Sequence, residues 1–383
     1  MSGAGEGASG AERIDWVARA MPGIRGLQPY QPGKPVAELE RELGIADAVK
    51  LASNENPLGP SPLALAAARA VMDGIARYPE GSAPELRQAL AARHRLDPAG
   101  ITVGNGSNDC LDLIARAFLG PGRNAVYAEH AFAVYPISTR AAGAEGRPAP
   151  ARPDDDPMPR GHDLEAMAQR VDRDTAVVFI ANPNNPTGTW LDARRLRDFL
   201  HSLPRHVIAV VDEAYVEYAR VPGYASAEPW LGELPNLIVT RTFSKVYGLA
   251  GLRVGYALSD PAVADLLNRV RQPFNVNLPA QAAAVAALGD EAHLERSLRC
   301  NREGLEALRR GLGDLGLRCL PSAGNFLCVD LGRDAAAVDR GLLERGVIVR
   351  PLGPYGLPRH LRITIGTAAE NARLLAALEE VLG

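Results

Sequence analysis

The chain has 383 residues, which is enough for a large hydrophobic core and for one large domain with a smaller one beside it. Its 42 Lys and Arg residues against 45 Asp and Glu leave a net charge of −3, so no overall basic field attracts a nucleic acid. Hydrophobic residues make up 46% of the sequence, but no apolar run approaches the length that spans a bilayer, which argues against a membrane protein.

The N-terminus and the cysteines indicate a compartment. Residues 1–13 are mainly Gly, Ala, Ser and Glu and lack the basic start and apolar centre of a signal peptide. Cys110, Cys300, Cys319 and Cys328 form no CxxC pair and show no repeated spacing. We therefore expect a cytoplasmic protein with reduced thiols, and neither a zinc site nor a disulfide framework.

The first third of the chain predicts an arm followed by helices. Residues 14–50 read as a helix, a Pro/Gly-broken extended piece that contains Tyr30, and a second helix. The polar loop LASNENPLGPSP (51–62) comes next, and loops of this kind often line sites. After two more helices, ITVGNGSNDCLDLIARAFLG (101–120) predicts a strand, a Gly/Asn/Ser turn and an amphipathic helix. Such a turn suits an anion at the helix N-terminus, or it is only a tight turn with an N-cap.

The middle of the chain repeats one pattern, in which a hydrophobic strand runs into a polar segment and a helix follows. This alternation predicts an α/β fold with a doubly wound, mainly parallel sheet. The Pro-rich stretch 147–161 reads as a loop within that domain. Helices at 278–288 and 291–313 and three later strand-like runs predict a smaller α+β domain. We expect limits at 1–50 for the arm, 51–270 for the large domain and 271–383 for the small one. The four repeated segments are NAVYAEHAFAVYPIS, DTAVVFIANPNNPTG, HVIAVVDEAYVEY and NLIVTRTFSK.

Polar side chains follow three of these strands. Lys245 lies beyond NLIVT, Asp212 and Tyr215 lie in VVDEAY, and Asn185 lies in NPNNPTG. Ligands of open α/β sheets bind beyond the carboxyl ends of the strands, so these residues face a common site unless Lys245 is merely solvated. A buried Asp212 requires a cationic or protonated partner, although it could also be a strand-end or N-cap acid.

This set of groups matches the needs of pyridoxal 5′-phosphate. That cofactor requires an amine for covalent attachment, an acid for its ring nitrogen, donors for its ring oxygen, and cations for its phosphate. A nicotinamide dinucleotide fits less well, because GNGSND at 104–109 lacks the third glycine of the GxGxxG turn.

The motifs GNGSND, NPNNPTG, DEAY and SKVYGLAGLR, in this order, resemble those of fold-type I aminotransferases, and Arg253 follows Lys245 by eight positions (253 − 245) as in that family. The flanking motifs are similar to those of the histidinol-phosphate aminotransferase group, and the resemblance runs from about Tyr30 to the C-terminus. It implies a mainly parallel seven-stranded sheet in the large domain, a smaller α+β domain, pyridoxal 5′-phosphate as cofactor, and transamination between L-histidinol phosphate and 2-oxoglutarate. These flanking motifs are LQPYQPGKP, LASNENPLGPSP, RYPEG, TFSKVYGLAGLRVGY, GVIVRPL and LRITIGT.

The resemblance also implies a role for each matching residue. Lys245 bonds the cofactor, Asp212 pairs with its ring nitrogen, and Asn185 and Tyr215 donate to its ring oxygen. Phe132 stacks on the ring, unless it is an ordinary core residue. Tyr78 reaches the phosphate from the neighbouring subunit, so a homodimer completes each site. The other phosphate-binding residues are Ser107, Asn108, Thr242, Ser244 and Arg253, and the substrate-binding residues are Tyr30, Asn56, Arg350 and Arg362. No metal is expected.

Three other functions stay open. An aromatic amino acid aminotransferase of the same subgroup acts on Phe or Tyr, whose flat ring and anionic group suit the same pocket. A decarboxylase acting on a phosphorylated amino acid shares the anion-binding requirement. A cofactor-binding regulator without catalysis is disfavoured because residues 1–29 carry no basic DNA-binding extension.

Overall fold

A computed structural model describes residues 14–29 and 33–383. Its largest element is a seven-stranded sheet in the order β2-β8-β7-β6-β5-β3-β4. Neighbouring strands from β7 to β4 are parallel, whereas β8 is antiparallel to both β2 and β7. The predicted α/β fold with a mainly parallel seven-stranded sheet is therefore confirmed. The strands are β2 (Ile101–Gly104), β3 (Asn124–Ala128), β4 (Glu145–Ala149), β5 (Thr175–Ala181), β6 (Ile208–Asp212), β7 (Leu237–Thr242) and β8 (Gly255–Leu258).

Both faces of this sheet are covered, which explains its apolar sequence. In β5, Val178 and Ile180 belong to one buried cluster, and their neighbours Val177 and Phe179 belong to another. Alternate residues of a strand point to opposite faces, so the continuous run TAVVFIA supplies two cores at once. The helices around the sheet are α4 (Pro62–Ala70), α5 (Pro84–His94), α6 (Ser107–Phe118), α7 (Val134–Ala141), α8 (Leu164–Arg170), α9 (Ala193–Ser202), α10 (Pro261–Val270) and α11 (Leu278–Gly289).

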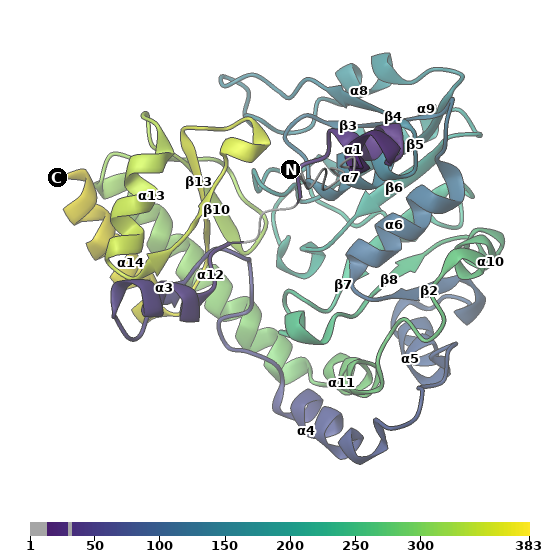
Figure 1. The fold of residues 1–383 in the computed structure, drawn as a ribbon, viewed down its shortest axis with the longest axis horizontal. Coiled ribbons are helices and arrows are strands. Elements are labelled where there is room, and N and C mark those ends of the chain that lie inside the picture. Colours follow the sequence, from purple (N-terminus) through teal and green to yellow (C-terminus); the bar gives the residue numbers. More distant parts are fainter. Residues whose placement is uncertain (1–13, 30–32) are drawn as a thin grey trace, which may run out of the picture.

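A smaller unit is built on a four-stranded antiparallel sheet in the order β12-β13-β10-β9. Figure 1 shows it beside the large sheet, with α12 running from α11 towards it. The start of α14 is fixed by a capping box, in which Thr367 and Glu370 each satisfy the other's backbone N–H. The elements of this unit are α12 (Glu291–Asp314), β9 (Arg318–Cys319), β10 (Phe326–Asp330), α13 (Ala335–Glu344), β12 (Arg350–Pro351), β13 (His360–Thr364) and α14 (Ala368–Leu382).

The N-terminal arm contributes to this smaller unit. β1 (Val49–Lys50) pairs in parallel with β11 (Val347–Ile348), although about 300 residues separate them. The described part of the arm also contains three short helices, α1 (Trp16–Arg19), α2 (Pro22–Arg25) and α3 (Val36–Leu43). Within the described parts of the chain, no helix is both long and apolar enough to cross a membrane.

One sequence prediction needs correction. The stretch 147–161 is not a loop throughout, because residues 147–149 belong to β4. Pro148 lacks an N–H to donate, and it is tolerated there because β4 is an edge strand. The domain limit at residue 270 stays a prediction, and α11 packs against α4 and α5 of the large unit. We propose that the small unit begins within α12.

Candidate active site

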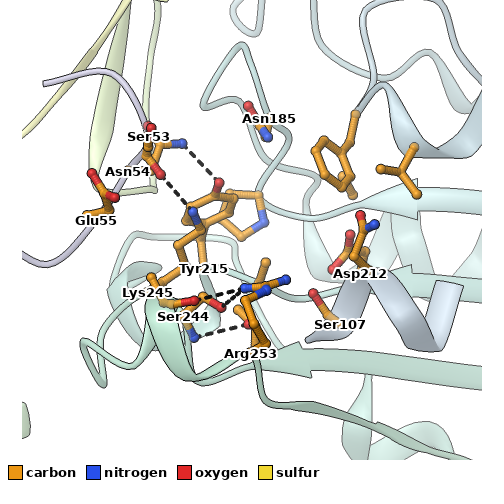
Figure 2. A pocket seen from close by; sticks show the side chains of 18 of the residues that line it. Ser53, Asn54, Glu55, Ser107, Asn185, Asp212, Tyr215, Ser244, Lys245 and Arg253 are labelled. Atoms are coloured by element: carbon orange, nitrogen blue, oxygen red, sulfur yellow. Dashed lines mark hydrogen bonds between the residues drawn. The ribbon is translucent and has the colours of Figure 1, made fainter. Parts of the chain in front are cut away.

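A cavity of about 550 Å³ opens where the carboxyl ends of β5, β6 and β7 meet the start of α6. Figure 2 shows side chains from these elements and from the loop after β1 pointing into it. The described residues around it include these sequence-predicted ones: Ser107, Asn108, Phe132, Asn185, Asp212, Tyr215, Thr242, Ser244, Lys245, Arg253 and Arg362. The other lining residues include Ser53, Asn54, Glu55 and Asp112. The sheet topology therefore gathers most of the predicted site.

Lys245 follows the end of β7 and is partly buried. Its Nζ donates a hydrogen bond to the carbonyl oxygen of Ser53 at 2.9 Å and lies 5.7 Å from the centre of the Tyr215 ring. Burial removes water from the ammonium group, and the charge of Arg362 adds repulsion, so the pKa of Lys245 falls to about 7. An appreciable fraction of the amine is unprotonated at neutral pH, as a nucleophile requires.

Asp212 is the last residue of β6, and only 6% of it is exposed. It accepts hydrogen bonds from Tyr135 Oη at 2.9 Å and Thr240 Oγ1 at 3.1 Å. Burial raises the pKa of its carboxyl group to about 6, although both hydrogen bonds oppose the shift. A carboxylate desolvated in this way is stabilised by a cationic partner, so the cavity is suited to a ligand with a protonated ring nitrogen.

Two further groups lie on the side of the cavity nearest the small unit. The Oη of Tyr215 accepts a hydrogen bond from Asn54 Nδ2 at 2.9 Å, and burial raises the pKa of Tyr215 to about 12, so its hydroxyl keeps its proton. Asn185 Oδ1 accepts a hydrogen bond from Arg362 Nη1 at 2.6 Å. Arg362, in β13, is 4% exposed and thereby brings a buried cation to the wall of the cavity.

The opposite end of the cavity is built for an anion. α6 begins at Ser107 after Gly106, whose φ of 90° favours glycine. A Cβ on Gly106 would lie 2.5 Å from Arg253 Nη2, so the missing side chain leaves room for that guanidinium. Arg253 Nη1 donates to Ala250 O at 3.0 Å and contacts Ser244 Oγ at 3.3 Å. Backbone N–H groups at a helix N-terminus, the hydroxyls of Ser107, Thr242 and Ser244, and an arginine fork together match a phosphate.

Phe132 lies between β3 and α7, is partly buried, and lines the cavity. Its ring packs edge-to-face on that of Tyr135, with 6.0 Å between the ring centroids. The Tyr135 ring in turn stacks on that of Phe179, with 4.9 Å between the centroids. Phe132 is therefore the one partly buried member of an aromatic group whose other members are fully buried, and its place at the cavity suits it to contact a flat ligand.

Among the described residues, three predicted ones do not line this cavity. Asn56 donates to Val246 O at 2.7 Å and to Ser297 Oγ at 2.9 Å, so its amide ties the Lys245 loop to α12. Arg350 is buried and pairs in register with Arg362 across β12 and β13, and its charge acts on Asp339 of α13. Tyr78 is 81% exposed and stacks on Phe274 at 4.6 Å. Tyr30 lies outside the described residues.

Sequence reasoning missed three contributors to the site. Tyr135 bonds Asp212, Asn54 bonds Tyr215, and the Ser53 carbonyl bonds Lys245. The polar run SNEN in residues 53–56 was a signal that this loop lines a site. However, nothing in the sequence distinguishes Asn54, which faces the cavity, from Asn56, which does not.

Comparison with known proteins identifies the family. Residues 46–378 match the model of aminotransferases of class I and II.

The chain belongs to this family.

Similar proteins include histidinol-phosphate aminotransferase 2 of Methylococcus capsulatus, which is 61% identical over 364 residues, covering 95% of this chain and 98% of that protein. The protein of the same name from Pseudomonas fluorescens is 57% identical over 370 residues, covering 96% and 98%. Among solved structures, histidinol-phosphate aminotransferase from Sinorhizobium meliloti in complex with pyridoxal-5′-phosphate has a TM-score of 0.85 at 34% identity, covering 95% and 98%.

Proposed function

We propose that this protein is a pyridoxal 5′-phosphate-dependent aminotransferase that exchanges an amino group between L-histidinol phosphate and 2-oxoglutarate, a step of histidine biosynthesis. The observation that carries the proposal is a single cavity that holds a low-pKa amine, a buried acid and an anion cradle. The relatives' names supply the substrate class.

The cavity residues fit this cofactor one by one. Asp212 would pair with the ring nitrogen, because its buried carboxylate is stabilised by a cation. Tyr215 and Asn185 would bind the ring oxygen, and Phe132 would contact the ring face. The phosphate would lie at the start of α6, where Ser107, Asn108, Thr242, Ser244 and Arg253 converge.

When bound, pyridoxal 5′-phosphate supplies an aldehyde for amines and a ring that withdraws electrons from the substrate carbon. Lys245 Nζ would hold the cofactor between turnovers and, when released, would move a proton to and from that carbon. Its pKa of about 7 makes both the free amine and the ammonium accessible at neutral pH. The Ser53 carbonyl, 2.9 Å from Nζ, would keep the released amine in the cavity.

Arg362 would bind the anionic end of each substrate. The two substrates present different anions, since 2-oxoglutarate carries carboxylates and histidinol phosphate carries a phosphate. A guanidinium binds either anion by donating two parallel hydrogen bonds. Arg350, the cross-strand neighbour of Arg362, would add positive charge beside it.

The proposal is tested with purified protein reconstituted with the cofactor. L-Glutamate should remove the visible absorbance band of the bound cofactor, and imidazole-acetol phosphate should restore that band. Lys245→Ala should lose the band of the lysine-bound cofactor, with far-ultraviolet circular dichroism as the control for folding. No response to imidazole-acetol phosphate would reject the substrate, and a band that persists in Lys245→Ala would reject the role of the lysine.

Of the alternative functions, aromatic amino acid transamination fits the site best, because Arg362 and the apolar wall at Phe132 suit a substrate with a flat ring and an anionic group. The ratio of kcat/KM for histidinol phosphate to that for phenylalanine separates the two functions. A larger value for phenylalanine would favour the alternative.

We also propose a homodimer in which Tyr78 reaches the phosphate of the neighbouring site. Tyr78 and Phe274 form an exposed stacked pair, and Leu63, Met72 and Ile75 expose apolar side chains in the same stretch of chain. A second copy covering this face would bury it. Mixing inactive Lys245→Ala and Tyr78→Ala chains should restore activity at about a quarter of the sites, since half of the randomly mixed dimers are hybrids with one intact site. No recovery in demonstrated hybrids would reject the shared site.

We further infer that the protein is located in the cytoplasm, because its four cysteine side chains are free thiols, as in a reducing compartment. Cell fractionation tests this location.

A further inference from the structure

Asn54, on the loop after β1, is 1% exposed, and each of its polar groups has a partner. Its backbone N–H donates to Thr364 Oγ1 at 2.9 Å, and its carbonyl accepts from Asn325 Nδ2 at 3.0 Å. Its side-chain Oδ1 accepts from Thr364 Oγ1 at 3.2 Å, and its Nδ2 donates to Tyr215 Oη at 2.9 Å. Figure 2 shows this last bond at the wall of the cavity.

The Thr364 hydroxyl fixes the orientation of this amide. A backbone N–H can only donate, so Thr364 Oγ1 accepts from Asn54 N–H and keeps its single proton for Asn54 Oδ1. The amide NH₂ must then face Tyr215, whose oxygen accepts its proton. A reversed amide would leave the Thr364 proton without this acceptor and would turn the Tyr215 proton towards Asn54.

The backbone at Asn54 restricts the residue type further. Its φ is 55°, in the left-handed region that asparagine adopts more readily than other residues with a side chain. Glycine adopts the same φ without strain. Asn54→Gly therefore removes the amide and keeps the backbone conformation.

We propose that Asn54 is a positioning residue that occupies the acceptor side of the Tyr215 hydroxyl and so directs its proton into the cavity. This inference rests on the proposed function, which places the ring oxygen of the cofactor there. Thr364 ends β13 and Asn325 precedes β10, so the orientation of Tyr215 depends on the small unit. The charged groups that face Tyr215 are Arg362, Asp212 and Lys245, and none of them makes this hydrogen bond.

The test uses the holoenzyme without substrate and follows the visible absorbance of the bound cofactor against pH. A hydrogen-bond donor to the ring oxygen favours the anionic form of that oxygen. A less well directed donor therefore raises the pH at the midpoint of the absorbance change. We expect Asn54→Gly to raise the midpoint by about half to one unit, which corresponds to one hydrogen bond. The dissociation constant of the cofactor should rise by about two- to tenfold. Thr364→Val, which removes the hydroxyl that orients the amide, should shift the midpoint in the same direction even if Asn54→Gly fails to fold.

A double-mutant cycle separates positioning from a general loss of stability. In a Tyr215→Phe background, Asn54→Gly should move the midpoint by less than about 0.2 unit, because the group it orients is gone. The control Asn236→Ala loses a 2.7 Å bond to Val207 O at the opposite end of β6 and β7, and should leave the midpoint unchanged.

The inference would be overturned if Asn54→Gly shifted the midpoint equally in the wild-type and Tyr215→Phe backgrounds, or if neither Asn54→Gly nor Thr364→Val shifted it. Both outcomes would leave the proposed function intact. A holoenzyme band that survives Lys245→Ala would instead overturn the proposed function and the inference together.

Discussion

Gly106→Ala should weaken cofactor binding, because the new methyl group would enter the space of Arg253. The added Cβ would lie 2.5 Å from Nη2 and 3.2 Å from Cζ of Arg253. The guanidinium end is flexible, so it would move away and lose its contacts with Ser244 and Ala250. The backbone angle of φ 90° adds about 1–3 kcal/mol of strain for a residue with a side chain.

Losing one charge-assisted contact to the phosphate costs about 1.5–3 kcal/mol, which corresponds to an increase in the dissociation constant of the cofactor of about ten- to a hundredfold. Titration of the cofactor-free protein with pyridoxal 5′-phosphate, followed by absorbance, measures this change. Urea unfolding of the cofactor-free protein measures the strain separately.

Two other glycines provide matched controls. Gly122 has φ of 80° and no atom within 4 Å of an added Cβ, so Gly122→Ala introduces the strain without the contact. Gly120→Ala should introduce neither, since its surroundings are equally open and its φ is not positive. If Gly106→Ala bound the cofactor as tightly as Gly122→Ala, the assignment of this end of the cavity to the phosphate would be refuted.

Three further predictions concern charged groups. Arg241→Met would leave the fully buried Glu213 without its partner 2.8 Å away, and should lower the unfolding free energy by about 3–5 kcal/mol in urea. The same change at the exposed Arg197 should cost less than about 1 kcal/mol, and equal losses would contradict the burial argument. The unfolding free energy of the cofactor-free protein should rise with pH from about 7 to about 10, because folding lowers the Lys245 pKa from 10.5 to about 7 and the folded chain then binds fewer protons. Lys245→Met should flatten this slope, and an unchanged slope would show that the lysine is not desolvated. Asp212→Asn should lower kcat at least about a hundredfold, because a neutral amide cannot stabilise a ring cation; a loss of less than about tenfold would argue against that pairing.

The sequence was sufficient to predict the site wherever a residue follows directly from the end of a parallel strand. Asp212 ends β6, and Asn185 and Lys245 lie beyond the ends of the adjacent strands β5 and β7, so the sheet topology alone brings them together. The apolar strands were equally readable, because burial on both faces leaves continuous hydrophobic runs. Motif order then supplied the cofactor and the family.

Residues placed by contacts between distant segments were not predictable in this way. Asn54 and Asn56 are two positions apart in the same polar loop, yet one faces Tyr215 and the other bonds α12. Their directions depend on how the small unit packs against the loop, which no local pattern encodes. β4 was missed for another reason, since its one proline and its charged residues are typical of an edge strand and also of a loop.

The pairing of β1 with β11 affects how this enzyme can be recombined with its relatives. A chimera that exchanges only the C-terminal residues would combine a native β1 with a foreign β11 and would separate Asn54 from its native partner Thr364. The exchangeable module is therefore discontinuous and includes residues 49–54 together with the C-terminal unit. Removal of residues 1–50 would likewise delete β1 and leave β11, near the opposite end of the chain, without this partner.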